Sequence, residues 1–371
     1  MAVELTQSGG YTFGGENGGA YKLNEAVSLT TKNAEVKPSS LTMRISVGLD
    51  QITRAMDSET AFMNGTKIYV QSLIKSTANI IENICFYGQT GLGKTASFTD
   101  AGTNLVEVAI KDGTYAAGIW VGAENSPFDL HAADGTKVND DRMVVDKISV
   151  TDKTVTLKTS AGDKAKLEAL ASDARELDFH YLGARGREMA GLDKIITNRG
   201  NLFGIDSSQY ALWRGNVYDA GGKRLSLSIT NKALAPAVNK GLDEDVTQWV
   251  NPDTFYDLVE EQAASRRYDV SYKGKAETGF KAIEFYTLNG MSKVVSHLSV
   301  KDGECFILPM KKVLRGGSSD VTFNPVDGRR IFFDLPEHSG IEMRLFSDQF
   351  IFCEAPAQCV KIENIVNGAE A

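Results

Sequence analysis

One long helical segment stands among many short strand-like segments, and this contrast limits what the chain can fold into. From about residue 57 to residue 84, apolar side chains recur at three- and four-residue steps with polar residues between them. The apolar positions are Val70, Leu73, Ile74, Ile81 and Ile84. This period predicts an amphipathic helix with Asp57 or Ser58 as its N-cap. Gly65 is the weak point of this helix, because glycine lowers helix stability.

Segments on both sides of this helix have the two-residue period of β-strands. Within 34–49, Leu41, Met43, Ile45 and Val47 alternate with polar residues, which predicts a strand. The last third of the chain, 280–365, is expected to be mainly strands. The segments that carry this pattern are AIEFYTL, KVVSHLSV, ECFILPM, RRIFFDL and IEMRLFSDQFIFC.

Region 103–160 is expected to form a separate group of short strands. The strand-like segments are VEVAI, YAAGIWVG, RMVVDKISV and KTVTLKT, and Gly, Asp and Asn turns separate them. Ile148 and Val150 are expected to pair with Val155 and Leu157 in a hairpin with one apolar face. Strands with a single apolar face suffice for a small sheet. We therefore expect this region to face away from the main core.

Four further helices complete the expected elements, and the fold class is α+β. The pattern predicts helices over 163–178, 229–242 and 250–265, and a short helix within 191–206. Asn251-Pro252 supplies the N-cap and the first position of the helix at 250–265. The sequence contains no internal repeat of 20–50 residues.

Residues 1–26 are rich in Gly, Ser, Thr and Asn, and they predict an arm without a core of its own. Six glycines in this segment have no side chain to bury. Tyr11, Phe13, Tyr21 and Leu23 are unusual for a linker. We expect these four side chains to hold the arm on an apolar surface, either of a neighbouring subunit or of the chain's own long helix.

Composition excludes several classes of protein. The 371 residues include 42% apolar and 24% charged residues, which is typical of globular proteins and excludes collagen, coiled coils and wholesale disorder. No apolar run reaches the length of a membrane span, and the first residues do not resemble a secretory signal. The net charge of −8 argues against a dedicated nucleic-acid binder. Four cysteines without a CxxC pair favour folding in a reducing compartment.

Residues 88–95 match the P-loop pattern GxxxxGK[ST], with Gly88, Gly93, Lys94 and Thr95 at the defining positions. A phosphate-binding P-loop needs a buried strand before the loop and a helix after it. Here a helix is expected before the loop, and the residues after it are poor helix formers. We interpret the match as a chance product of a glycine-rich turn. A nucleotide-binding enzyme remains the alternative.

Other catalytic signatures are absent from the sequence. The four histidines have no metal-ligand spacing, and no GxSxG motif occurs. Cys353 and Cys359 are too isolated a pair for a zinc site. No cofactor, metal or catalytic residue is therefore predicted.

Several segments resemble the major capsid proteins of tailed bacteriophages. Residues 191–216 resemble the segment that opens the axial domain of that family, with Gly204-Ile205-Asp206, Ser208, Tyr210 and Trp213 in its motif. The helix at 57–84 followed by YGQTGLG resembles the family's spine helix and the glycine-rich turn after it. The other similar segments are 249–258, 280–317 and 343–365.

The resemblance implies the Hong Kong 97-type capsid fold, with an N-arm, a long spine helix, an extended β loop, a peripheral domain and an axial domain. The implied parts are an arm (1–33), the peripheral strand and spine helix (34–100), an extended loop or inserted β-subdomain (101–162), a return to the peripheral domain (163–190), the axial domain (191–335) and the closing peripheral strand with the C-terminus (336–371). Relatives that cross-link their shells use a Lys–Asn isopeptide bond, whose positions have no match here.

The function implied by the resemblance is that of a structural, non-enzymatic subunit. Hexamers and pentamers would assemble in the bacterial cytoplasm into an icosahedral head around double-stranded DNA, without sequence-specific DNA binding and without a membrane. The implied partners are other copies of the chain, a portal protein at one vertex, and possible separate scaffold and decoration proteins. An encapsulin-like cargo shell of the same fold is the first alternative.

Overall fold

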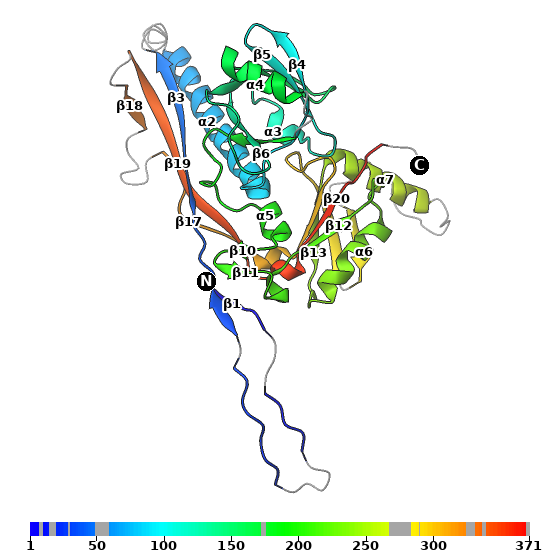
Figure 1. The fold of residues 1–371 in the computed structure, drawn as a ribbon. Helices are drawn as coiled ribbons and strands as arrows, with labels where there is room; N and C mark the ends of the chain where they lie inside the picture. Colours follow the sequence, from blue (N-terminus) through cyan, green and yellow to red (C-terminus); the bar gives the residue numbers. More distant parts are fainter. Residues whose placement is uncertain are drawn as a thin grey trace.

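The long helix α2 (Glu59–Tyr87) lies beside a long twisted sheet, and two further units lie near its C-terminal end (Figure 1). The structure is a computed structural model that describes residues 1–6, 10–14, 20–28, 30–48, 59–171, 176–266, 283–288, 290–323, 331–335 and 339–368. The helix predicted over 57–84 is confirmed for the described residues. Its expected N-cap, Asp57 or Ser58, lies outside them.

The long sheet is antiparallel and is built around its longest strand. Its members are β3 (Ser39–Gly48), β17 (Val313–Thr322), β18 (Phe332–Asp334) and β19 (Gly340–Cys353). β19 pairs with each of the other three strands, so β3 lies beside a strand about 300 positions later in the chain. Leu73 of α2 packs between Val47 of β3 and Leu345 of β19. The strand expected within 34–49 is thus confirmed, whereas Ile74 of the expected helix face is exposed.

A second, fully antiparallel sheet follows α2 in the chain, and we call it the β4–β9 sheet. Its strands are β4 (Thr95–Gly102), β5 (Leu105–Ile110), β6 (Pro127–Ala132), β7 (Met143–Ser149), β8 (Thr154–Lys158) and β9 (Leu177–Tyr181). They lie in the order β4-β5-β8-β7-β6-β9. The first and last strands meet at a bridge between Lys94 and Asp178, so the sheet closes on itself there.

Two predictions for this region are wrong. YAAGIWVG does not form a strand, because Ala117–Trp120 form the short helix α3. A side chain at Gly118 would lie 2.8 Å from the Leu298 carbonyl carbon, so small residues let this turn pack against another loop. The helix expected over 163–178 is α4 (Ala161–Ala171), and Leu177 belongs to β9. Pairing with β6, a strand that the sequence reading missed, overrides the helical spacing at Leu177.

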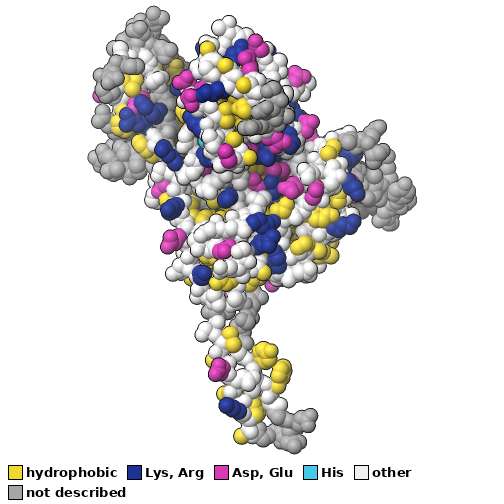
Figure 2. Space-filling model, in the orientation of Figure 1, with side chains coloured by type: hydrophobic (Ala, Val, Ile, Leu, Met, Phe, Trp, Pro, Cys, Tyr) yellow, Lys and Arg dark blue, Asp and Glu magenta, His cyan; other side chains and the backbone are white. Residues whose placement is uncertain are grey.

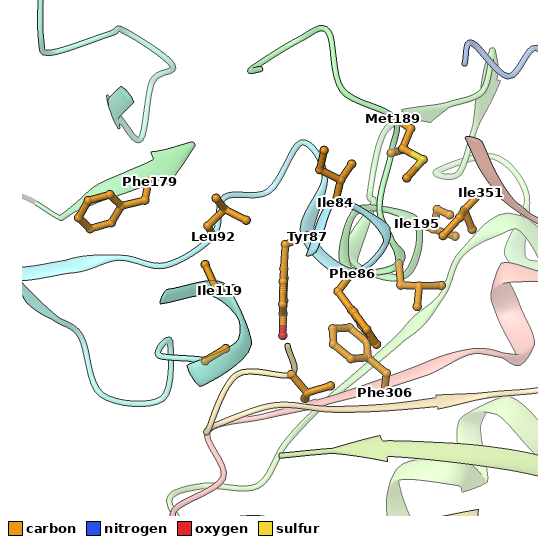
Figure 3. Close-up of a cluster of buried hydrophobic side chains, with 14 of the residues drawn as sticks. Ile84, Phe86, Tyr87, Leu92, Ile119, Phe179, Met189, Ile195, Phe306 and Ile351 are labelled. Carbon is orange, nitrogen blue, oxygen red and sulfur yellow. The ribbon is translucent and has the colours of Figure 1, made fainter. Parts of the chain in front are cut away.

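The β4–β9 sheet does not face away from the main core, which corrects a third expectation. The hairpin of β7 and β8 is present, with Ile148 opposite Val155. Apolar side chains from β5, β6, β7, β8 and β9 are fully buried, and they join the largest apolar cluster of the described residues. This cluster continues through the end of α2, where Phe86 and Phe306 have ring centroids 5.8 Å apart (Figure 3). The sheet also extends beyond the range 101–162, because β4 begins at Thr95 and β9 lies at Leu177–Tyr181.

The third sheet is mixed and carries two helices. Its strands are β12 (Asn216–Asp219), β13 (Val246–Val250), β14 (Ile283–Thr287), β15 (Gly290–Ser296), β16 (Cys305–Leu308) and β20 (Val360–Glu363), in the order β12-β20-β16-β13-β15-β14. The predicted helices α6 (Leu227–Val238) and α7 (Pro252–Arg266) contact it. The backbone N–H of Asp253 donates to the Asn251 side chain at 2.9 Å, which confirms the expected N-cap.

Short elements connect these units. They are β1 (Ala2–Glu4), β2 (Thr31–Asn33), α5 (Leu192–Thr197), β10 (Asn201–Leu202), β11 (Ile205–Asp206), η1 (Ala211–Trp213), η2 (Met310–Lys312) and η3 (Pro356–Gln358). The helix α5 is the short helix that the sequence predicts within 191–206. The arm leaves the body beside β1 and β2 (Figure 1).

Candidate functional site

The glycine-rich turn at 88–95 ends α2 in a crowded place. A Cβ atom at Gly88 would lie 2.2 Å from the Met189 carbonyl oxygen, so no other residue fits there. Gln89 and Gly91 have φ of 70° and 99°, the left-handed region that favours glycine. Gly88 and Gly91 are therefore required by the backbone, independently of any ligand.

Five backbone amides of this turn donate hydrogen bonds within the protein itself. A P-loop binds phosphate with free N–H groups that point into the loop. Here the hydrogen bonds are Gly88 N to Ile84 O (2.8 Å), Gln89 N to the Glu188 carboxylate (2.8 Å), Thr90 N to Tyr87 O (3.0 Å), Leu92 N to Phe179 O (2.8 Å) and Lys94 N to Thr114 Oγ1 (3.2 Å). These donors are not free to bind an anion.

The turn instead presents a carbonyl oxygen to a buried cation. Lys301 Nζ donates to Gly91 O at 3.0 Å and lies 3.9 Å from the centre of the Tyr87 ring. Burial lowers the pKa of Lys301, while Glu304 and Asp193 act in the opposite direction. The polarity of this turn is therefore opposite to that of a phosphate-binding loop.

The last two residues of the motif lie where the first and last strands of the β4–β9 sheet meet. Lys94 is exposed, and its Nζ lies 3.6 Å from the Glu176 carboxylate. Thr95 begins β4 and is buried, and its hydroxyl accepts the Leu177 N–H at 2.9 Å. A strand, not a helix, thus follows the motif. The arrangement favours the interpretation that Gly88, Gly93, Lys94 and Thr95 match the P-loop pattern by chance.

A buried charge cluster joins α5 to the mixed sheet. Lys361 Nζ of β20 lies 2.6 Å from Asp193 Oδ1 and 2.8 Å from Glu304 Oε1. Burial alone would raise the pKa of Asp193, but Lys361 and Lys301 outweigh it and hold that pKa below its ordinary value. The cluster borders a cavity of about 740 Å³ beside the glycine-rich turn. Sequence reasoning missed it, and a lysine between buried Val360 and Ile362 was the available signal.

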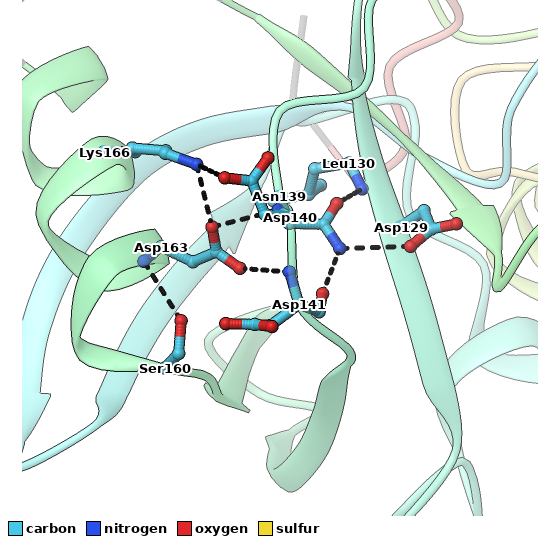
Figure 4. A network of polar contacts seen from close by, with 8 residues as sticks. All are labelled: Asp129, Leu130, Asn139, Asp140, Asp141, Ser160, Asp163 and Lys166. Atoms are coloured by element: carbon cyan, nitrogen blue, oxygen red, sulfur yellow. Dashed lines mark hydrogen bonds and ion pairs between the residues drawn. The ribbon is translucent and has the colours of Figure 1, made fainter.

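A polar network fixes the loop between β6 and β7 (Figure 4). The Asn139 side chain accepts the Leu130 N–H at 2.9 Å and donates to Asp129 at 3.0 Å. Asp163 accepts the N–H groups of Asp140 and Asp141 at 3.0 and 2.8 Å, and these bonds help to hold its pKa low against the effect of burial. Each of these groups has a hydrogen-bond partner within the protein. The network therefore stabilises the loop and has a structural role.

The arm exposes the side chains that the sequence singled out. The exposed fractions are 73% for Tyr11, 86% for Phe13, 52% for Tyr21 and 73% for Leu23. Hydrophobic side chains are visible along this segment in Figure 2. The two limbs of the arm are linked by bonds from Asn24 to Tyr11 O and Thr12 Oγ1. The arm does not lie on α2 in this structure; it extends away from the body (Figure 1).

The base of the arm is anchored on the body. β1 and β2 pair antiparallel, and the Met1 amino group donates to Ala34 O at 2.9 Å. Val3, Leu5 and Ala34 are buried. The apolar groups farther along the arm therefore have no cover within the described part of the chain.

Metal and membrane sites are not found among the described residues. No group of three His, Cys, Asp or Glu side chains in the described ranges is placed to hold a metal ion. Within the same ranges, every helix is too short or too polar to cross a membrane.

Comparison with known proteins finds a structural match that covers nearly the whole chain. No protein-family model and no curated protein matches the sequence. The capsid asymmetric unit of cyanophage A-1(L) contains a chain that matches with a TM-score of 0.54 at 11% identity, over 98% of this chain and 87% of that chain. The chain has the fold of a phage capsid protein. The α+β capsid fold implied by the resemblance is thus confirmed, while the domain boundaries stay predictions.

Two further solved structures match with lower TM-scores. A chain from the capsid of a native GTA particle matches with a TM-score of 0.49 at 8% identity, over 99% of this chain and 84% of that chain. An encapsulin complex from Synechococcus elongatus matches with a TM-score of 0.29 at 9% identity, over 67% of this chain and 85% of that chain.

Proposed function

We propose that this chain is the major capsid protein of a tailed bacteriophage and assembles as hexamers and pentamers into an icosahedral head around double-stranded DNA. The observation that carries the proposal is a phage capsid fold that spans nearly the whole chain, with 98% of it covered by the cyanophage match. The role is structural and not enzymatic. Assembly would take place in the host cytoplasm, and the mature protein would lie in the virion.

The arm supports this proposal because its apolar side chains need a partner surface. Ordering backbone costs about 1–2 kcal/mol per residue, which the mostly exposed side chains of the arm do not offset within the subunit. A neighbouring subunit supplies apolar surface at about 25 cal/mol per Å² buried. Tyr11, Phe13, Tyr21 and Leu23 are thus our candidates for subunit contact. The own-helix alternative finds no support in the extended arm of Figure 1.

Closed rings follow from contacts between different faces of identical subunits, provided that the rotation closes. A single interface of standard size buries about 1,600 Å² in total. Several such interfaces per subunit make a shell cooperative even when each is weak. The net charge of −8 fits a shell that confines DNA without binding it tightly.

The domain assignment is part of the proposal. The arm is 1–33, the peripheral domain comprises 34–100 and 163–190 with the closing strand at 336–371, and the axial domain is 191–335. These ranges assign β17 and β18 of the long sheet to the axial domain and β20 of the mixed sheet to the closing segment. The inserted β-subdomain assigned to 101–162 would include the middle strands of the β4–β9 sheet. A portal protein at one vertex and separate scaffold or decoration proteins are the expected partners.

Electron microscopy of the purified full-length protein tests the proposal. We expect closed shells, tubes or ring-shaped capsomers, and small monodisperse monomers under all assembly conditions would contradict it. Deletion of residues 2–26 is expected to lower particle yield at least tenfold. Phe13→Ser should reduce the yield, whereas Phe13→Leu, which keeps an apolar side chain, is the matched control. Shells that carry a cargo protein and no DNA in the native host would instead favour the encapsulin-like alternative.

A further inference from the structure

Two cysteines lie in contact at the connection between the long sheet and the mixed sheet. Cys353 is the last residue of β19, and Cys359 directly precedes β20. Their Sγ atoms are 3.4 Å apart. Both side chains are fully buried, with exposed fractions of 0% and 1%. The turn η3 between them brings the two sulfurs together.

The backbone on each side holds this arrangement independently. Cys353 pairs with Val313 in the ladder of β17 and β19. The carbonyl oxygen of Cys359 accepts the backbone and side-chain N–H groups of Asn216, both at 3.1 Å. Because two separate sets of hydrogen bonds fix the two residues, the contact between their thiols is a property of the fold.

We propose that Cys353 and Cys359 are a dithiol site that forms a disulfide within the subunit when it meets a low-molecular-weight disulfide as oxidant. One thiolate attacks a sulfur of the oxidant and releases one small thiol. The second protein thiol then attacks the mixed disulfide and releases the other small thiol. Two protein thiols and one small disulfide thus become one protein disulfide and two small thiols.

The change in geometry that this step needs is small. The sulfurs must approach from 3.4 Å to about 2.0 Å. The hydrogen bond with Cys353, together with burial, raises the pKa of the Cys359 thiol. Because both thiols are buried, the oxidant reaches them only when the chain opens locally, and the reaction is slow at neutral pH and faster in alkaline solution. Such a bond would fix the crossover at 354–359 between the two sheets.

Mass spectrometry tests the site directly, because one tryptic peptide, residues 345–361, contains both cysteines. The full-length protein is incubated with oxidised glutathione at alkaline pH, denatured, alkylated with N-ethylmaleimide and digested. We expect this peptide to lose two hydrogens and to carry no alkyl group. Treatment with a reductant before alkylation should restore two alkyl groups. Cys85→Ser is the matched control and should behave as the wild type does.

Three results would overturn the proposal. They are full alkylation of both cysteines after prolonged oxidation, a stable glutathione adduct on this peptide, or a disulfide between subunits. Cys353→Ser and Cys359→Ser should each prevent the mass loss and abolish the rise in melting temperature that oxidation gives the wild-type protein. Particle formation is a separate readout. Failure to form shells would refute the proposed function, and failure to lose two hydrogens would refute the disulfide alone.

Discussion

The arm and the β4–β9 sheet are both made of short segments separated by glycines. The arm exposes its apolar side chains, whereas the sheet buries them. Phe13 of the arm is 86% exposed, whereas Phe128 of β6 is 0% exposed. The sheet closes on itself and continues into the core at the end of α2 (Figure 3). The arm has backbone pairing between strands only at β1 and β2 within the described residues.

This difference indicates that the sheet stabilises the folded subunit, whereas the arm is available for contact with other subunits. Phe128, Phe179 and Trp120 bury one another, so the sheet stabilises the subunit without outside help. Tyr11 and Phe13 of the arm contact each other, but all four apolar side chains of the arm stay at least 52% exposed, so they gain little from folding of the isolated subunit. Substitutions in the two regions should therefore affect different measurements.

The largest expected effect comes from Phe179→Ala in β9. The ring of Phe179 lies 4.9 Å from that of Trp120, measured between centroids, and is fully buried. Its removal leaves a cavity and should lower the free energy of unfolding by about 3–5 kcal/mol. Urea denaturation of the subunit measures this loss. A loss below about 1 kcal/mol would show that the sheet is not part of the core.

The second prediction concerns the charge cluster at α5. Asp193→Asn leaves Lys361 with one carboxylate fewer in a buried place, and we expect a loss of about 3 kcal/mol near neutral pH. The folded-state pKa of Asp193 lies below its ordinary value of about 3.9. Its contribution is therefore present above this pH and is lost as the pH falls through the folded-state pKa.

The wild-type protein and Asp193→Asn should thus converge in stability under acid conditions. Denaturant titrations between neutral pH and the lowest pH at which the protein folds measure the difference. A difference that stays constant across this range would contradict the account of the cluster.

The third prediction concerns the glycine-rich turn. Gly91→Val places a β-branched residue at φ of 99° and close to Asp178, which should cost about 1–3 kcal/mol. Lys94→Ala removes an exposed lysine and should cost less than about 1 kcal/mol. Equal losses in the two variants, measured by thermal unfolding, would contradict the backbone role of the turn.

Nucleotide binding at the same turn is the related negative test. Because five of its amides are already bonded and a strand follows it, we expect no saturable heat when Mg-ATP is titrated into the protein. Micromolar binding that Lys94→Ala abolishes would restore the P-loop interpretation.

The smallest effect on stability is expected from Phe13→Ala in the arm. With its side chain 86% exposed, this variant should change the free energy of unfolding by less than about 0.5 kcal/mol. Particle yield should nevertheless fall severalfold. An unchanged particle yield together with a large loss in the free energy of unfolding would contradict the account. It would show that Phe13 stabilises the subunit and does not contribute to assembly.

The spacing of apolar residues predicted the elements that have a clear helical or strand period. The strand at β3 and the helix α2 have clear periods and long apolar faces, so both could be predicted. YAAGIWVG has strand-like residues, yet Gly118 packs against the loop at Leu298 and the segment forms a helical turn. Leu177 fits the helical spacing of α4 equally well, and only its distant partner β6 makes it a strand residue.

Contacts between distant residues set the limit of the sequence reading. The closure of the β4–β9 sheet joins the glycine-rich turn to Phe179, and no local period signals that pairing. Asp193, Glu304 and Lys361 are widely separated in the chain, so the apolar neighbours of Lys361 signal a buried lysine but not which carboxylates pair with it. The arm candidates could be chosen because aromatic residues among glycines are conspicuous in any sequence. Their role in subunit contact stays a prediction.

Hydrogen exchange at the arm is the most direct test of the central claim, which is that the arm is ordered by a neighbouring subunit. Amide exchange is compared between free subunits and assembled particles, with the β4–β9 sheet as the internal reference. We expect the amides of 10–14 and 20–28 to exchange rapidly in free subunits and to be protected in particles, while those of β8 are protected in both. Arm amides that are already protected in free subunits, or that stay unprotected in particles, would contradict the account.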